Sequence, residues 1–159
     1  MNFQEAFTLD RETGRLFWKA PPKNHAQRRG DEAGFLCPGK GKNKTYWHIR
    51  VFGKTFKRSR IVFHMTHGRW PEPAVDHSNG DSLDDRPSNL RECTLSQNAA
   101  NSRPRNRPLP KGVTRTRQGG FMARITQNGK TVSLGVYGTP TDAFAAYEAA
   151  KREVFREFA

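Results

Sequence analysis

The sequence predicts an α+β protein built from several small parts, and three observations support this fold class. Short runs of strand-forming residues dominate residues 1–58. The stretch Val75–Asn101 has the pattern of a strand, a long polar turn, a second strand and a short helix. Residues 112–159 contain three strand-like runs followed by one amphipathic run. We therefore expect a small N-terminal β-rich region, a compact strand–strand–helix unit, and a three-stranded antiparallel sheet packed on one C-terminal helix.

Changes in composition divide the chain into four segments. The β-rich region covers 1–58, and a helix together with the strand–strand–helix unit covers 59–102. Residues 103–111 form a basic, proline-rich linker, and the sheet-and-helix domain covers 112–159. Prolines remove helix and strand options, so we expect the linker to be extended. Such a chain either follows the phosphates of a nucleic acid or is a plain solvated linker.

The charge balance favours a polyanionic partner. The 159 residues include 28 Lys and Arg against 15 Asp and Glu, a net charge of +13 that is typical of nucleic-acid-binding proteins. The hydrophobic fraction is only 34%, so we expect small cores. Cys37 and Cys93 form no CxxC pair, which excludes a four-cysteine zinc site and fits a reduced, cytoplasmic setting. No apolar run approaches membrane-spanning length, and no signal-peptide pattern opens the chain, so we expect no membrane association.

The first elements follow from local patterns. Arg15–Lys19 and Tyr46–Phe52 are rich in strand formers, and Thr55–Lys57 can return as a hairpin partner after a turn at Gly53-Lys54. Residues Ser59–Gly68 have the apolar spacing of a helix, with Ser59 as its expected cap and Gly68 as its end.

The middle of the chain predicts a strand, a long turn, a strand and a helix. Ala74 and Val75 begin the first strand, and turn formers follow from Ser78 onward. Leu90–Thr94 is the expected second strand, and Ser96 the expected cap of the short helix. The aspartates of the long turn are interpreted as turn and loop residues, because they lack the pattern of a calcium loop.

The side chains in this stretch suit phosphodiester hydrolysis, which needs an activated water and neutralisation of charge on the leaving oxygen. A neutral imidazole accepts a proton near physiological pH, so His77 is the candidate general base. A hard divalent cation prefers oxygen ligands, which Asp76 and Asn98 can supply. Adjacent strand residues point to opposite sides, so Asp76 and His77 can serve one phosphate only if the strand bends or ends there.

The stretch resembles the HNH nucleases, in the phage and intron-encoded branch in which the final histidine is an asparagine. The resemblance rests on Asn98 and on three motifs: VDH at Val75–His77, NGD at Asn79–Asp81 and SNL at Ser88–Leu90, whose Asn89 lies twelve residues after His77. It implies a ββα-metal finger.

The resemblance implies a role for each candidate residue. His77 is the general base, and Asn89 completes the catalytic set by tethering the loop and helping to orient His77. Asp76 and Asn98 bind one divalent ion, Mg²⁺ with Mn²⁺ as the alternative. Asn101 is a rival to Asn98 for the metal, and the spacing of nine residues from Asn89 favours Asn98 by resemblance.

Residues 112–159 predict a three-stranded meander followed by a helix. A strand begins at Gly112–Arg115, and Phe121–Gln127 and Lys130–Gly135 flank Asn128-Gly129, a strong signal for a tight hairpin. Thr139 is the expected cap of a helix whose apolar face covers one side of the sheet. We expect the arginines of the strands and turn to lie on the other side.

This part resembles the Apetala-type DNA-binding domain, which lays its sheet in the major groove. The resemblance assigns DNA binding to Arg115, Arg117, Arg124 and Lys130. The linker adds candidate phosphate contacts at Arg103, Arg105, Arg107 and Lys111.

Together these features predict a metal-dependent DNA endonuclease of the homing type, in the bacterial cytoplasm if phage-encoded. One finger holds one metal site, so we expect a monomer or weak dimer that nicks duplex DNA without a small-molecule cofactor. The alternatives are a DNA-binding regulator with a degenerate finger, and an enzyme or binder directed at RNA.

Overall fold

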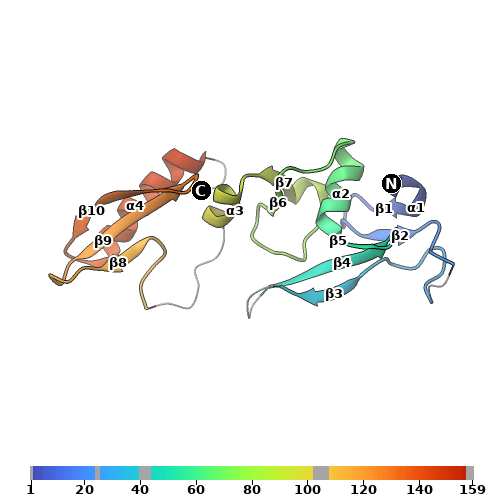
Figure 1. Ribbon diagram of the computed structural model, residues 1–159, viewed down its shortest axis with the longest axis horizontal. Coiled ribbons are helices and arrows are strands. Elements are labelled where there is room, and N and C mark those ends of the chain that lie inside the picture. The colour runs from blue at the N-terminus through green and yellow to red at the C-terminus, as the bar shows by residue number, and fades with distance from the viewer. Residues whose placement is uncertain (1, 24–25, 40–43, 102–107, 157–159) are drawn as a thin grey trace. The chain divides into compact units, whose positions relative to one another are not determined.

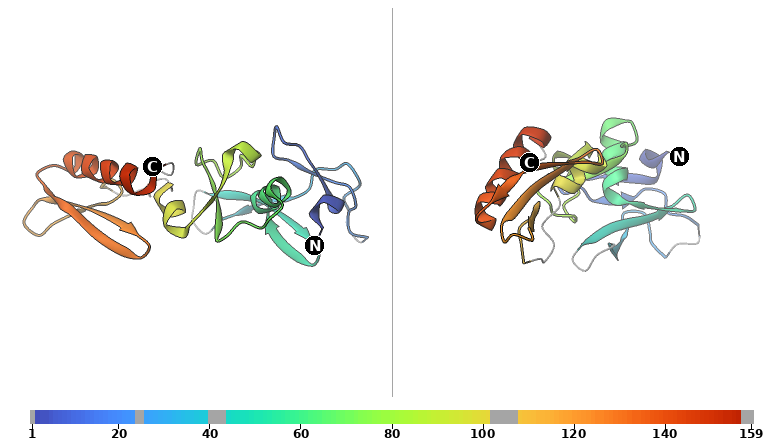
Figure 2. Two further views of the ribbon diagram at one scale, coloured as in Figure 1. Left: turned by 90° about the horizontal axis from the view of Figure 1, so that it is seen from above. Right: turned by 60° about the vertical axis from the view of Figure 1, so that its left-hand side comes forward.

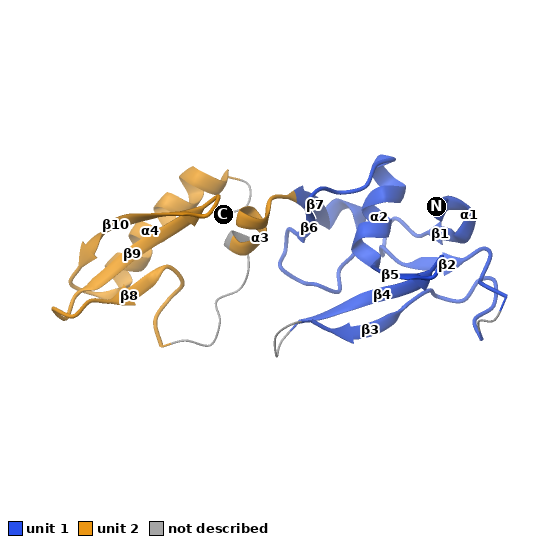
Figure 3. Cartoon of the chain, in the orientation of Figure 1, with its two compact units in different colours: residues 1–92 blue, residues 93–159 orange. Residues whose placement is uncertain are grey.

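The computed structural model describes most of the chain (Figure 1). The described residues are 2–23, 26–39, 44–101 and 108–156, with the side chains of residues 100 and 101 left out. The chain divides into two compact units, Met1–Glu92 and Cys93–Ala159 (Figure 3). Both units mix helices with antiparallel sheets, so the predicted α+β class is confirmed. The four-segment division of the sequence stays a prediction.

The described residues of the first unit form three small sheets. Its elements are α1 (Phe3–Ala6), β1 (Phe7–Leu9), β2 (Leu16–Trp18), β3 (Phe35–Pro38), β4 (Thr45–Val51), β5 (Lys54–Lys57), α2 (Arg58–His67), β6 (Ala74–His77), η1 (Pro87–Asn89) and β7 (Leu90–Cys93), the last of which runs one residue past the unit. Strand β1 pairs with β2, and β6 pairs with β7. Strand β4 is the centre of the sheet β3-β4-β5.

Alternation explains how β4 packs. Ile49 and Val51 are buried, whereas Arg50 between them is exposed. The hairpin to β5 turns at Phe52-Gly53, one residue earlier than the sequence predicts, and both residues have positive φ (52° and 72°). Tight hairpin turns have this conformation, which glycine adopts without steric cost and phenylalanine adopts rarely.

Helix α2 begins at Arg58, and Ser59 lies inside its first turn, so the expected cap at Ser59 is wrong. Strand β5 runs directly into the helix, which leaves Lys57 at the cap position without a side-chain cap. Gly68 ends the helix in the left-handed conformation (φ 71°), as its sequence predicts. The helix buries Ile61 and Val62 against the hydrophobic core of the unit.

The second unit contains α3 (Leu95–Asn101), β8 (Val113–Arg115), β9 (Phe121–Gln127), β10 (Lys130–Tyr137) and α4 (Pro140–Phe155). The sheet order is β10-β9-β8, and α4 lies along one of its faces (Figure 2). Val113, Ala123 and Ala143 are buried between them. The predicted three-stranded sheet with one packing helix is therefore confirmed.

The predicted hairpin and cap of the second unit are also present. Asn128 and Gly129 both have positive φ (50° and 78°), as a tight hairpin turn requires. The hydroxyl of Thr139 accepts a hydrogen bond of 3.1 Å from the N–H of Asp142, which caps α4.

The cap of α3 differs from the prediction. Thr94, not Ser96, caps this helix: its hydroxyl accepts the N–H of Gln97 at 3.2 Å, and the Gln97 side chain accepts the N–H of Thr94 at 2.8 Å. This reciprocal pair is a capping box. The hydroxyl of Ser96 instead accepts the N–H of Asn128 at 2.9 Å.

Gly14 packs directly on the peptide group that follows Asp85. Its φ is +71°, and a Cβ there would lie 2.2 Å from the carbonyl carbon of Asp85. We expect Gly14→Ala to lower the free energy of unfolding by about 2–5 kcal/mol, from left-handed backbone strain and overpacking together. Gly30→Ala is the matched control, because Gly30 also has positive φ (+93°), but no atom of the described residues lies within 4 Å of an added Cβ.

Urea titration measures both variants. The control should lose only about 1–2 kcal/mol, the backbone share of the effect. Equal losses in the two variants would show that the contact with Asp85 is unimportant.

Candidate active site

Asp76 and His77 lie where strand β6 ends. Both are buried, with 5% and 7% of their surface exposed. The chain turns directly after them, because the N–H of Gly80 donates to the carbonyl of His77 at 2.9 Å. The strand therefore ends at the position where the sequence argument requires it to bend or end.

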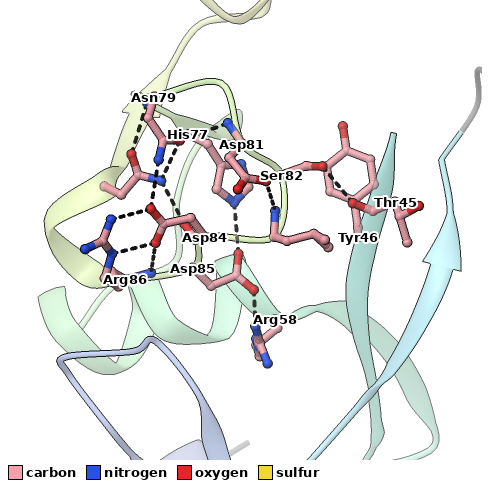
Figure 4. Close-up of polar contacts among 12 residues, drawn as sticks. Thr45, Tyr46, Arg58, His77, Asn79, Asp81, Ser82, Asp84, Asp85 and Arg86 are labelled. Atoms are coloured by element: carbon pink, nitrogen blue, oxygen red, sulfur yellow. Dashed lines mark hydrogen bonds and ion pairs between the residues drawn. The ribbon is translucent and has the colours of Figure 1, made fainter. Parts of the chain in front are cut away.

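A carboxylate that the sequence analysis missed holds the imidazole of His77. The Oδ1 atom of Asp85 lies 2.9 Å from Nε2 of His77 (Figure 4). The other oxygen of Asp85 accepts a hydrogen bond of 2.8 Å from Nε of Arg58, the first residue of α2. Asp85 has only 1% of its surface exposed. Asp85 lies in the loop, as the sequence predicts, but its partners are a helix residue and the candidate base, a role that the sequence analysis did not assign to it.

Arg58 is fixed in turn by two residues from the β-rich region. Its Nη1 atom donates to Glu32 at 3.0 Å. Its guanidinium carbon lies 4.6 Å from the centroid of the Trp47 ring, in a cation–π contact. Buried charges are tolerated when they are paired and hydrogen-bonded, and this cluster meets that condition.

Asp76 is paired with an arginine of the neighbouring strand. Nε and Nη2 of Arg91, on β7, lie 3.1 and 3.0 Å from Oδ2 of Asp76. The guanidinium therefore neutralises the carboxylate at short range.

Asn89 ties down the loop that follows His77. Its side-chain oxygen accepts the N–H of Asn79 at 3.0 Å. Its side-chain nitrogen donates to the Asn79 side chain at 3.1 Å and to the carbonyl of Asp84 at 2.8 Å. Its own carbonyl accepts the N–H of Ser78 at 2.9 Å. Asn89 thus joins the beginning and the end of the loop.

Two further contacts order this loop. Arg86 binds both oxygens of Asp84, at 2.7 and 2.6 Å, and this pairing holds the pKa of Asp84 below its ordinary value. The hydroxyl of Ser82 donates to the carbonyl of Thr45 on β4 at 2.7 Å (Figure 4). The loop is therefore held by a contact within itself and by a contact to the sheet β3-β4-β5.

The predicted metal ligands lie in different units. Asp76 is on β6 of the first unit, and Asn98 is a half-exposed residue of α3 in the second. The side chain of Asn101, the rival ligand, is outside the described residues. Within the described part of the chain, no three or more His, Cys, Asp or Glu side chains form a metal-binding group. The pairing of Asp76 with Asn98 on one ion stays a prediction.

Four candidate DNA contacts of the C-terminal sheet and its turns are exposed: Arg115, Arg117, Arg124 and Lys130. Arg124 is on the open face of the sheet, since its neighbours Ala123 and Ile125 are buried. Arg115 lies on the opposite face, because side chains alternate and Val113, two residues earlier, is buried against α4. The expectation that both arginines share the open face is therefore wrong.

The other candidate contacts are more scattered. Arg117 is in the turn after β8, and Lys130 begins β10. The ammonium group of Lys111 donates to the carbonyl of Ala99 at the end of α3. The remaining linker residues, Arg103, Arg105 and Arg107, are outside the described residues.

Residues 56–100 match the family model described as an HNH endonuclease. This segment includes the His77 site but is less than half of the chain. The match supports a nuclease of the HNH endonuclease class, with DNA as its substrate and a divalent metal ion as the usual cofactor of that class. No curated protein and no solved structure matched the chain. Among the helices of the described residues, none has the length and apolar character needed to cross a bilayer.

Proposed function

We propose that this protein is a metal-dependent endonuclease of the homing type that hydrolyses phosphodiester bonds in duplex DNA, one strand at a time. The observation that carries the proposal is the His77–Asp85 pair, 2.9 Å apart at the end of β6, with Asp76 as the adjacent residue. A buried, hydrogen-bonded imidazole inside a segment that matches HNH endonucleases is a suitable general base.

The chemistry follows from these groups. His77 accepts the proton of a water as that water attacks the phosphorus, and the bond from phosphorus to the 3′ oxygen breaks. The hard oxygen donors of Asp76 and Asn98 fit a divalent cation such as Mg²⁺ or Mn²⁺, which when bound stabilises the charge on the leaving oxygen. Asn89 keeps the loop closed behind His77 through its bonds to Asn79 and Asp84.

The C-terminal sheet is proposed to supply target affinity. Its open face presents Arg124 beside the hydroxyls of Thr126 and Thr131, which bond to each other at 2.8 Å. Arg117 and Lys130 add exposed cations at the ends of the strands. Arg117, Lys130 and the linker arginines could contact DNA phosphates. Arg124, on a strand, could reach base edges in the major groove.

One observation favours a second candidate, a DNA-binding regulator without cleavage. Arg91 already binds the carboxylate of Asp76, and a carboxylate neutralised in this way is a poorer cation ligand. The two candidates differ in one measurable property, the conversion of DNA in the presence of a divalent ion.

We expect the protein to convert supercoiled plasmid to nicked circles with Mg²⁺, because the cation is needed at the leaving oxygen. EDTA should stop the reaction, and added Mg²⁺ should restore it. Gel electrophoresis over time measures the products. Linear DNA that forms as early as nicked circles would contradict cutting of one strand at a time. Salt-sensitive DNA binding without any cleavage, with Mg²⁺ or Mn²⁺, would favour the regulator.

A further inference from the structure

The contact between His77 and Asp85 determines which ring nitrogen of His77 carries the hydrogen. The two side chains approach through Nε2 and Oδ1, at 2.9 Å, and both residues are buried. The second oxygen of Asp85 is occupied by Nε of Arg58 at 2.8 Å. An arginine keeps its proton under all ordinary conditions, so Asp85 faces a permanent cation on one side and the imidazole on the other.

An ionised carboxylate only accepts hydrogen bonds. The nitrogen of His77 that faces Asp85 must therefore carry the hydrogen, and the neutral ring is the Nε2–H tautomer. Its other nitrogen, Nδ1, then carries the lone pair. Only that nitrogen of such a ring can accept a proton.

Residues well before the matched segment hold Asp85 in place. Gly14 packs on the Asp85 peptide so closely that a Cβ would lie 2.2 Å from its carbonyl carbon. Glu32 accepts a hydrogen bond from Arg58 at 3.0 Å, and Trp47 lies under the same guanidinium. The β-rich region thus fixes both the main chain and the charge partner of Asp85.

We propose that Asp85 is the positioning residue of His77, and that it makes Nδ1 the nitrogen that takes the proton from water. This inference rests on the proposed endonuclease function and refines it. It gives residues 1–58 a part in catalysis: they hold the carboxylate that selects the tautomer.

The decisive variant is Asp85→Asn. Arg58 can only donate, so it should take the amide oxygen and leave the NH₂ group facing His77. The ring would then have to accept at Nε2, and the proton would move to Nδ1. We expect the kcat for plasmid nicking to fall about 10²–10⁴-fold, the usual range for loss of a general base. The KM for DNA should stay within about threefold, since Asp85 is buried and does not touch DNA.

Nitrogen-15 NMR of labelled protein reads the tautomer directly. The wild-type protein should show Nε2–H at His77, and Asp85→Asn should show Nδ1–H. Asp81→Asn is the matched control, since it makes the same change at an exposed residue of the same loop and should alter neither the tautomer nor kcat. In a His77→Ala background, Asp85→Asn should cause no further loss of nicking, because it acts through the imidazole.

The outcomes separate the two proposals. An Nδ1–H ring in the wild-type protein, or a full kcat in Asp85→Asn, overturns the positioning role. The wild-type spectrum decides the matter even if the variant does not fold. A wild-type protein with the Nε2–H ring that fails to nick DNA under any divalent ion would refute the endonuclease proposal and leave the positioning of His77 intact.

Discussion

His77→Ala should lower the rate of DNA nicking by about 10²–10⁴-fold while DNA affinity stays nearly unchanged. The variant removes the group that takes the proton from water. It leaves untouched the exposed cations proposed to bind phosphates. Single-turnover nicking with enzyme in excess measures the chemical step, and a binding titration at fixed salt measures affinity.

His67→Ala serves as the control for this experiment. His67 is an exposed histidine near the end of α2, where its Nδ1 lies 3.1 Å from the carbonyl of Phe63. Its removal should leave the nicking rate within about twofold of wild type, because it is outside the proposed site. If His77→Ala cuts DNA as fast as this control does, His77 is not the base.

Arg58→Ala should produce the largest loss of stability, about 3–5 kcal/mol in the free energy of unfolding. The substitution leaves the buried Asp85 carboxylate without its 2.8 Å partner, and it removes the cation above Trp47. The cost of an uncompensated buried charge exceeds the benefit of any single exposed ion pair. Urea titration at neutral pH measures the loss.

Arg69→Ala is the comparison for Arg58. Arg69 makes two short bonds to Glu92, at 2.7 and 2.6 Å, and these hold the pKa of Glu92 at about 2. The arginine is nevertheless more than half exposed, at 58%. We expect a much smaller loss of stability than for Arg58→Ala, because water screens an exposed ion pair. Equal losses in the two variants would mean that burial of Asp85 does not control stability.

The local elements of the site could be predicted from the sequence because their signals are local. The apolar start at Val75, the turn formers after His77 and the strand formers from Leu90 each lie within a few residues of the structure they specify. The same is true of the Asn128-Gly129 turn, whose two positive φ angles suit those residue types.

Asp85 could not be found in this way, because its environment is assembled from distant parts of the chain. Its partner Arg58 is 27 residues earlier. A run of two aspartates, an arginine and a proline has the composition of an exposed turn, and nothing local shows that the second carboxylate is buried.

Two differences between the prediction and the structure have local signals in the sequence. Thr94 and Gln97 have the spacing of a capping box, and Thr94 is nearer than Ser96 to the end of β7. Val113 and Arg115 are two residues apart in one strand, so burial of the first determines the face of the second.

The close packing of Gly14 on the Asp85 peptide limits where the chain could be truncated without disturbing the His77 site. A fragment that starts at residue 56 would include His77, Asp85 and Arg58, and would satisfy the family match. It would lack Gly14, which packs on the Asp85 peptide. It would also lack Glu32 and Trp47, which hold the guanidinium of Arg58. Moving residues 56–100 into another scaffold would therefore require the preceding 55 residues, or a designed substitute for each of those three supports.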